Sequence, residues 1–278
     1  MSSIALCPKD LTNFRKNAII GLYKSSSIFD IFMIKTEEIL IKGQKNKETF
    51  CDIFSYEPEN IEEASLGSLF MVAQLTGNQD SSHLINLLSS LIKREYYSLP
   101  HRGPTASLEA GLKRANSTLS EIANQGNLSW LGKLHFICAA INKEKELFLT
   151  QTGSAQAYLY REGELVSITK KIIPSTEKPH PAKTFQNVIT GNVAPSDKIL
   201  FGTPALFESF SIPGLNQLFS FSIEHIADQI NKNLREQKKP NPLGALLIEI
   251  VAEAPAPQAL KQKKDFITPP ISLEEIIK

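Results

Sequence analysis

The sequence predicts an α+β protein, because strand and helix patterns form separate runs along the chain. Apolar and β-branched segments come first, two amphipathic helices follow, further strands come next, and one more helix precedes a last strand. A fold with a parallel sheet would instead alternate single strands with single helices. With 278 residues, the chain is long enough for one large domain or two small ones with a substantial core.

Strand patterns dominate the first third of the chain. Residues 28–34 and 38–42 are apolar segments separated by polar residues, and we interpret them as two paired strands. Residues 50–56 are another candidate strand. The run 69–73 is apolar without interruption, which is typical of a strand buried on both faces.

Two consecutive amphipathic helices are predicted next. Leucine and isoleucine recur at helical spacing in both segments, and Pro100 and Pro104 separate them. Asp80 is a candidate cap for the first helix. We expect helices over 81–96 and 105–124 that pack antiparallel on one sheet.

A second group of strands follows the helices. Residues 134–141 and 147–150 are joined by a charged turn. Residues 157–160 and 165–168 flank Arg161-Glu162-Gly163, and a glycine-containing turn between two such runs predicts a hairpin.

The last part of the chain predicts a loop, a helix, a strand and a tail. The segment 172–185 is rich in Pro and Lys and is expected to be a surface loop. Ser222 is expected to cap the third helix, and 246–251 form the closing strand. Ala, Pro, Gln and Lys then dominate. We therefore expect a folded domain over 1–252 and a flexible tail over 253–278 that is removable at little cost in stability.

Composition argues against several classes of function. The net charge of +1 predicts no preference for nucleic acid or for an anionic membrane. The three cysteines are far apart and lack C-x-x-C spacing, which favours a reduced, cytoplasmic chain. No segment has the pattern of a signal peptide or reaches the ~20 apolar residues of a membrane span. The five histidines show no zinc-binding spacing.

Two stretches resemble a known family. Residues 153–159 read Gly-Ser-Ala-Gln-Ala-Tyr-Leu before a glycine-bearing hairpin, and residues 197–208 read D-K-I-L-F-G-T-P-A-L-F-E. In this order they resemble the metal-dependent serine/threonine phosphatases, the PPM or type 2C family. In that family G-D-S-R-A-Y-L precedes D-x-h-L-h-x-T-D-G-L-h-E, where h is an apolar residue and x is any residue. The resemblance covers roughly residues 28–251 and implies a four-layer αββα sandwich of two antiparallel β-sheets flanked by helices.

The same resemblance implies two Mg²⁺ or Mn²⁺ ions held by aspartates, which activate water for attack on a phosphoester. At four family positions the acid is replaced, by Gln74, Ser154, Pro204 and Asn241. One neutral replacement is tolerable, but four leave two dications with almost no compensating charge. We therefore expect no catalytic residue, no metal site and no other cofactor.

Other interpretations of these residues are weaker. The family's N-E-D motif matches Lys47-Glu48-Thr49 only at Glu48. Ser154 lies in Gly-Ser-Ala-Gln-Ala, which superficially resembles the elbow of a serine hydrolase. A hairpin lacks the strand-to-helix turn that such an elbow needs.

Two functions from different classes remain open. The favoured hypothesis is a catalytically inactive pseudophosphatase that acts as a binding or regulatory module for a protein partner. The alternative is a divergent metal-dependent protein serine/threonine phosphatase, with Mg²⁺ or Mn²⁺ held by other acids such as Asp52, Asp80, Asp197 or Asp228. Metal content and activity on a phosphoester with Mn²⁺ discriminate between them.

Overall fold

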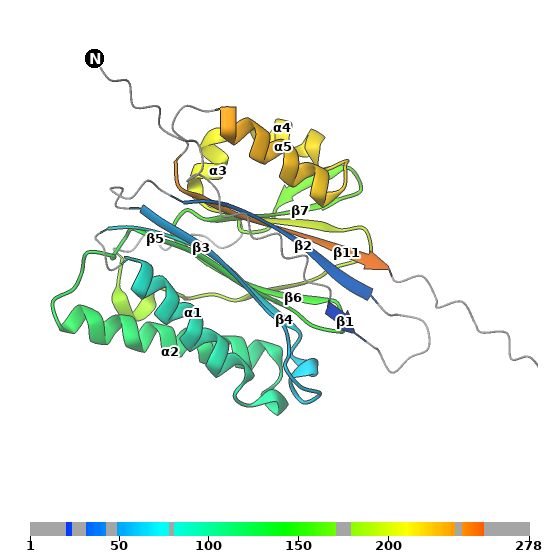
Figure 1. The fold of residues 1–278 in the computed structure, drawn as a ribbon. Helices are drawn as coiled ribbons and strands as arrows, with labels where there is room; N and C mark the ends of the chain where they lie inside the picture. Colours follow the sequence, from blue (N-terminus) through cyan, green and yellow to red (C-terminus); the bar gives the residue numbers. More distant parts are fainter. Residues whose placement is uncertain are drawn as a thin grey trace, which may run out of the picture.

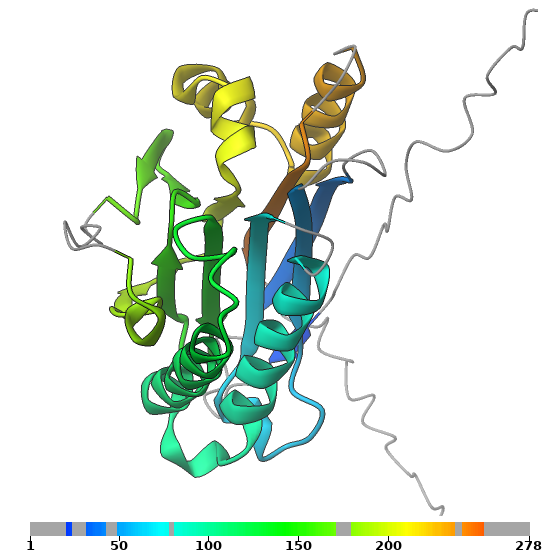
Figure 2. The same ribbon diagram turned by 90° about the vertical axis from the view of Figure 1, so that its left-hand side faces the viewer.

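The computed structural model of the protein describes residues 21–23, 32–42, 49–77, 81–170, 179–236 and 241–252. Two antiparallel sheets pack face to face, and helices cover the outer face of each (Figures 1 and 2). This arrangement confirms the predicted α+β class and the four-layer αββα sandwich.

The first sheet has the strand order β1-β2-β11-β10-β7-β8. Its strands are β1 (Gly21–Tyr23), β2 (Phe32–Ile41), β7 (Gln156–Arg161), β8 (Glu164–Ser167), β10 (Lys198–Gly202) and β11 (Leu243–Ala252). The second sheet has the order β3-β4-β5-β6-β9. Its strands are β3 (Thr49–Tyr56), β4 (Ser68–Thr76), β5 (Leu134–Ile141), β6 (Glu146–Thr152) and β9 (Ile189–Asn192).

Five α-helices lie within the described residues. They are α1 (Ser81–Tyr97), α2 (Pro104–Asn124), α3 (Pro204–Ser209), α4 (Ile212–Leu218) and α5 (Ile223–Glu236). Short 3₁₀ turns occur at Glu63–Ser65, Pro100–Arg102 and Pro181–Lys183. None of the helices in this part of the chain is long and apolar enough to cross a bilayer.

Strand β4 shows why the core has separate layers. Its residues are buried along nearly the whole strand. Phe70 and Val72 face the other sheet, whereas Met71 and Ala73 face α1 and α2. Successive side chains of a strand point to opposite faces, so one apolar run supplies two apolar layers.

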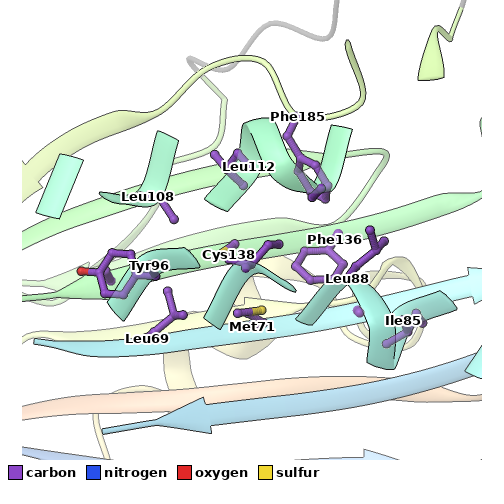
Figure 3. Close-up of a cluster of buried hydrophobic side chains, with 14 of the residues drawn as sticks. Leu69, Met71, Ile85, Leu88, Tyr96, Leu108, Leu112, Phe136, Cys138 and Phe185 are labelled. Atoms are coloured by element: carbon purple, nitrogen blue, oxygen red, sulfur yellow. The ribbon is translucent and has the colours of Figure 1, made fainter. Parts of the chain in front are cut away.

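The layer under α1 and α2 is a continuous apolar cluster (Figure 3). Ile85 and Leu88 from α1 meet Leu108 from α2 over the side chains of β4 and β5. Each fully buried side chain of this size contributes roughly 1.5–3 kcal/mol of hydrophobic stabilisation. The predicted helices 81–96 and 105–124 therefore pack together on one sheet, as expected.

In the opposite helical layer, helix α5 is as the sequence predicts. The Ser222 hydroxyl accepts a hydrogen bond from the backbone N–H of His225 at 3.4 Å, at the start of α5. The apolar face of α5 is buried on the first sheet. Its buried residues are Ile223, Ile226, Ala227, Ile230 and Leu234.

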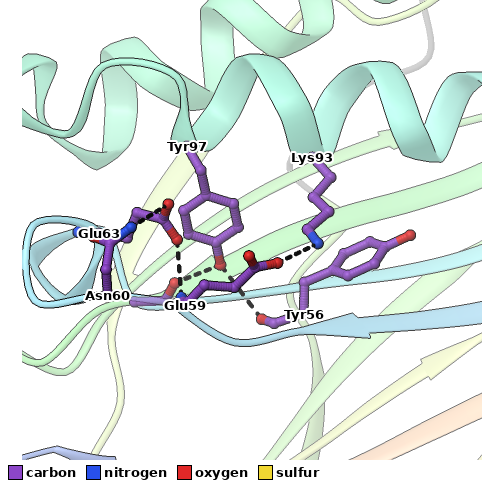
Figure 4. Close-up of polar contacts among 7 residues, drawn as sticks. Tyr56, Glu59, Asn60, Glu63, Lys93 and Tyr97 are labelled. Carbon is purple, nitrogen blue, oxygen red and sulfur yellow. Dashed lines mark hydrogen bonds and ion pairs between the residues drawn. The ribbon is translucent and has the colours of Figure 1, made fainter.

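The loop between β3 and β4 is tied to the end of α1 (Figure 4). The Tyr97 hydroxyl donates to the carbonyl of Gly67 at 2.8 Å. Lys93 lies 4.8 Å from the centre of the Tyr56 ring and donates to the Glu59 carboxylate at 2.9 Å. The exposed ion pair contributes little, so the buried tyrosine bond and the ring contact hold this loop.

One prediction for the N-terminal strands is wrong. Residues 32–41 form the single strand β2, not parts of two paired strands, and residues 28–31 lie outside the described part of the chain. Strand β11 pairs with β2 from Phe32 to Ile41, which keeps the polar middle of β2 in the sheet. Within that middle, the Glu38 carboxylate accepts a hydrogen bond from the Ser55 hydroxyl at 3.2 Å.

The segment before β9 is also more than a surface loop. Phe185 is 4% exposed, and its ring centre lies 5.4 Å from that of Phe136. The Asn116 side chain accepts from the Phe185 N–H at 3.0 Å and donates to its carbonyl at 2.7 Å. Residues 179–185 are therefore anchored on α2, while 171–178 lie outside the described residues.

The sequence interpretation missed α3 and α4. Each follows a hydroxyl residue, Thr203 or Ser211, and each carries a proline, Pro204 or Pro213, in its first turn. That combination is a helix-start signal. The expected tail 253–278 lies outside the described residues, so the domain boundary after residue 252 stays a prediction.

Removing the Phe185 ring should destabilise the protein, because it opens a cavity between α2 and β5. We expect Phe185→Ala to lower the free energy of unfolding by about 3–5 kcal/mol in urea titrations. Phe221→Ala is the matched control, because that ring is 52% exposed, and its cost should stay below about 1 kcal/mol. Equal costs for the two variants would contradict the anchoring of this segment.

Candidate functional site

The four positions singled out in the sequence lie at one end of the sandwich. Gln74 is near the end of β4, Ser154 lies between β6 and β7, Pro204 follows β10, and Asn241 precedes β11. Strand register places these segments together, because Gly202 at the end of β10 pairs with both Gln156 and Ala245. We call this region, where β4 and β10 end and β7 and β11 begin, the site end.

Hydrogen bonds within the first sheet and close packing between the two sheets hold the site end together. The Thr203 N–H donates to the carbonyl of Gly244 at 2.9 Å, and the Thr203 hydroxyl accepts from the Gly244 N–H at 3.1 Å. A side chain at Gly244 would lie about 3.5 Å from Val72 and about 3.6 Å from Ile53, so β11 closely approaches β4 and β3. The turn that carries Asn241 and the helix that begins at Pro204 are thereby fixed beside the second sheet.

Gln74 is the buried member of the set. It is 9% exposed and pairs in register with Cys51 on one side and His135 on the other. Strand alternation points its side chain toward the other sheet, as it does for Val72. Its buried amide oxygen has no hydrogen-bond partner among the described residues, which costs roughly 1–3 kcal/mol and is uncommon in folded proteins.

His135 connects Gln74 to Ser154. The Ser154 backbone N–H donates to His135 Nδ1 at 2.9 Å. Burial lowers the pKa of His135 below its ordinary value, and the Glu208 carboxylate opposes that effect. The ring is therefore neutral near pH 7, with its proton on Nε2 because Nδ1 accepts.

This geometry does not form a serine hydrolase site. Ser154 is exposed on a turn, and His135 receives the backbone N–H of Ser154 through Nδ1. The preceding Gly153 has a φ of +67°, and a side chain there would lie 2.4 Å from the Leu134 carbonyl oxygen. Glycine at 153 thus permits a tight turn against β5, not a strand-to-helix elbow.

Cys51 is also unsuited to nucleophilic chemistry. It is 2% exposed, and burial together with the neighbouring Asp52 carboxylate raises the pKa of its thiol well above the ordinary range. The thiolate is the reactive form, so this thiol is inert at neutral pH.

The donor atoms at the site end do not fit a pair of divalent cations. Gln74 supplies a neutral amide, Ser154 and Asn241 supply exposed neutral groups, and Pro204 has no side-chain donor. Across the described ranges, no cluster of three or more His, Cys, Asp and Glu residues is placed to hold a metal. Mg²⁺ and Mn²⁺ need anionic oxygen ligands, which these four residues do not provide.

Asp80, considered both as a helix cap and as a metal ligand, lies outside the described residues, and the other three acids considered for a rebuilt site do not converge there. Asp197 precedes β10, at the strand end far from Gly202, and binds Arg161 through contacts of 2.9 and 2.6 Å. Asp228 is exposed on α5, and Asp52 pairs in register with Ala73, which faces the α1–α2 layer. Glu208 is the acid that acts on His135. His135 was missed by sequence reasoning, because only long-range strand pairing brings it beside Gln74.

Comparison of the sequence gives no relative. Neither the protein-family models nor the curated proteins match this chain.

Comparison of the three-dimensional structure gives clear matches. The chain is similar to PppA, described as a key regulatory component of T6SS in Pseudomonas aeruginosa, with a TM-score of 0.58 and 16% identity over 78% of this chain and 97% of that one. It is similar to the catalytic domain of the serine/threonine protein phosphatase PstP in complex with two manganese ions, with a TM-score of 0.57 and 14% identity over 79% and 99%.

A third match is the phosphatase domain of the cell-fate determinant SpoIIE from Bacillus subtilis, with a TM-score of 0.52 and 12% identity over 81% of this chain and 95% of that one. Each match covers nearly all of the known structure and most of this chain, so it concerns the whole architecture. The chain has the fold of the PPM-type serine/threonine phosphatases.

Proposed function

We propose that this chain is a catalytically inactive, PPM-like pseudophosphatase that acts as a binding or regulatory module for a protein partner. The observation that carries the proposal is the neutral chemistry at the site end. Gln74, Ser154, Pro204 and Asn241 lie where β4 and β10 end and where β7 and β11 begin, and none of them carries a charge.

Electrostatics explains why loss of these acids matters. A two-metal site depends on clustered carboxylates to neutralise the ions, and those carboxylates repel one another when the ions are absent. Neutral side chains remove both the ligands and the repulsion. The fold then needs no cation for stability, because its core is apolar on both sides of each sheet.

The chemistry of the site end suits protein recognition. Ser154 and Asn241 are exposed and can donate and accept hydrogen bonds, whereas the amide oxygen of Gln74 is buried out of reach of a partner. Neutral polar groups of this kind bind peptide backbone without the desolvation cost of a charge. PppA, a regulatory component of T6SS to which this fold is similar, supports a regulatory use of the architecture.

The alternative function is a divergent phosphatase with a rebuilt site. It is favoured by one observation, the Glu208 carboxylate that acts on His135 at the site end. One carboxylate and one imidazole are fewer ligands than two dications need.

A thermal melt with and without Mn²⁺ separates the two functions. Because an ion stabilises only a state that it binds, millimolar Mn²⁺ should leave the melting temperature nearly unchanged, and a phosphoester should not be hydrolysed. A large rise in melting temperature together with metal-dependent turnover would establish the divergent phosphatase instead.

Restoring carboxylates gives a matched series for the same experiment. Pro204→Asp alone should not confer Mn²⁺ binding, because three neutral positions remain. Replacing Gln74, Ser154, Pro204 and Asn241 together by Asp should lower stability without metal and make the melting temperature rise with Mn²⁺. If the fourfold variant folds but its melting temperature does not change with Mn²⁺, these four residues do not occupy former metal-binding positions.

Stability should fall in acid partly because of His135. Its folded-state pKa lies below the ordinary value of about 6.5, so its contribution is complete above that pH and is lost progressively as the pH falls toward the lowered pKa. His135→Gln should reduce the difference in unfolding free energy measured above and below about pH 6.5. His101→Gln, at an exposed position, is the control and should leave that difference unchanged.

Charge added at the site end should disrupt partner binding. The double variant Ser154→Arg, Asn241→Arg changes two exposed positions and should retain the wild-type melting temperature. Proteins captured by the wild-type chain in a pull-down should be lost with this variant. Ile61→Arg is the control, because Ile61 is 93% exposed in the β3–β4 loop at the opposite end. If the captured proteins are lost with Ile61→Arg but kept with the double arginine variant, the interaction surface lies away from the site end.

A further inference from the structure

Strand β9 lies at the edge of the second sheet, and its outer side is open. Among the described strands, it pairs only with β6. Thr190, Gly191 and Asn192 are exposed, and a side chain at Gly191 would meet no atom within 4 Å. An edge of this kind presents backbone groups to which another strand can bind.

The register with β6 shows which residues of β9 point outward. The Val193 N–H donates to the carbonyl of Lys145 at 2.8 Å, and this bond continues the ladder in which Gly191 faces β6. Successive residues of a strand direct their N–H and C=O groups to opposite sides. The backbone groups of Thr190 and Asn192 therefore point away from β6.

Most of these outward groups lack a hydrogen-bond partner. The Asn192 carbonyl accepts from the Arg161 side chain at 2.9 Å. Within the described part of the chain, nothing pairs with the Asn192 N–H or with the N–H and C=O of Thr190. The edge thus offers two donors and one acceptor to an extended backbone.

Side chains occupy groups at two other strand edges. On β8, the Leu165 N–H donates to the Asn216 side chain at 2.7 Å, and the Gly163 carbonyl accepts from that side chain at 3.3 Å. On β3, the Ile53 N–H donates to the Asp52 carboxylate at 3.0 Å. Side chains that occupy edge groups prevent pairing with another strand, and β9 has no such protection at its centre.

A groove of about 640 Å³ lies beside β9, between α2 and the segment that leads into the strand. Val188 lines the groove and directly precedes β9. Phe185 adds apolar surface, and Glu109 and Lys113 contribute one charge of each sign. The whole chain has a net charge of only +1. Electrostatic repulsion between two copies of this surface is therefore weak.

The outward groups of β9 are complementary to themselves. A two-fold interface requires one patch that matches its own reversed copy. The N–H and C=O of Thr190 meet this requirement, because an antiparallel pair of residues can exchange both bonds.

We propose that a second copy of this chain pairs with β9 in antiparallel orientation, with Thr190 opposite the same residue of the other copy. Two reciprocal Thr190 bonds lie at the two-fold axis, and the Asn192 N–H of each copy meets the Val188 carbonyl of the other. The two five-stranded sheets become continuous, with their grooves on the same face. The interface uses none of the four positions at the site end, so it is independent of the proposed function.

Opposite charges at position 190 test this register. Sedimentation equilibrium of the full chain, from about 1 μM to about 1 mM, should show a reversible dimer. Thr190→Lys and Thr190→Glu each place like charges opposite one another and should weaken the dimer roughly tenfold or more. An equimolar mixture should restore it, because Lys then faces Glu. Val166→Lys, at a 54% exposed position on β8, is the control and should leave the dimer unchanged.

A second variant tests the backbone contact. Thr190→Pro removes an outward N–H without removing a bond to β6, so it should abolish the dimer and keep the melting temperature of the dilute chain. In the wild-type chain, hydrogen exchange of the Thr190 amide should slow as the concentration rises. If Thr190→Pro fails to fold, the Lys and Glu variants still decide the register.

Three results would overturn the proposal. The first is a wild-type chain that stays monomeric over the whole concentration range. The second is a dimer that Thr190→Lys leaves intact, since its interface then lies elsewhere. The third is strong protection of the Thr190 amide in a dilute monomer, which would show that another segment of the same chain covers the edge.

Discussion

The apolar layer between the two sheets is the interaction on which the site end depends. Val72 from β4 and Ile53 from β3 meet the backbone of β11 at Gly244, and Thr203 exchanges two hydrogen bonds with that same residue. Every segment that carries a site position ends or begins at strands held by this layer. The geometry of the site end therefore comes from hydrophobic packing, which needs no ion to hold it.

That source of stability explains how the fold tolerates neutral residues at its site end. Clustered carboxylates destabilise an empty metal site, so under the proposed function the neutral groups here avoid that repulsion without removing apolar contacts. The remaining local cost is the buried amide oxygen of Gln74, which has no partner among the described residues. At position 153, glycine avoids the backbone strain that another residue would meet. The cost at Gln74 is minor beside a core that runs through three apolar layers.

Sequence patterns predict the fold well where the signal is local. Helical spacing gives α1, α2 and α5, and the glycine turn gives the β7–β8 hairpin. Sequence patterns fail where contacts between distant parts of the chain determine the structure. Pairing with β11 keeps the polar middle of β2 within one strand, and hydrogen bonds to Asn116 hold the segment that buries Phe185. Motif order gives the four positions at the site end, and their role stays a prediction. His135 could not be found in this way, because it reaches Gln74 only through strand register.

The two ends of the second sheet are held by different interactions. At the end where β4 begins, Tyr96 and Tyr97 donate hydrogen bonds to the carbonyls of Leu66 and Gly67. At the other end, the amide oxygen of Gln74 and the hydroxyl of Ser81 are buried without a hydrogen-bond partner among the described residues. Each such atom costs roughly 1–3 kcal/mol. Long-range tyrosine bonds therefore stabilise the first end, whereas packing of the apolar layers has to offset the unpaired polar atoms of the second.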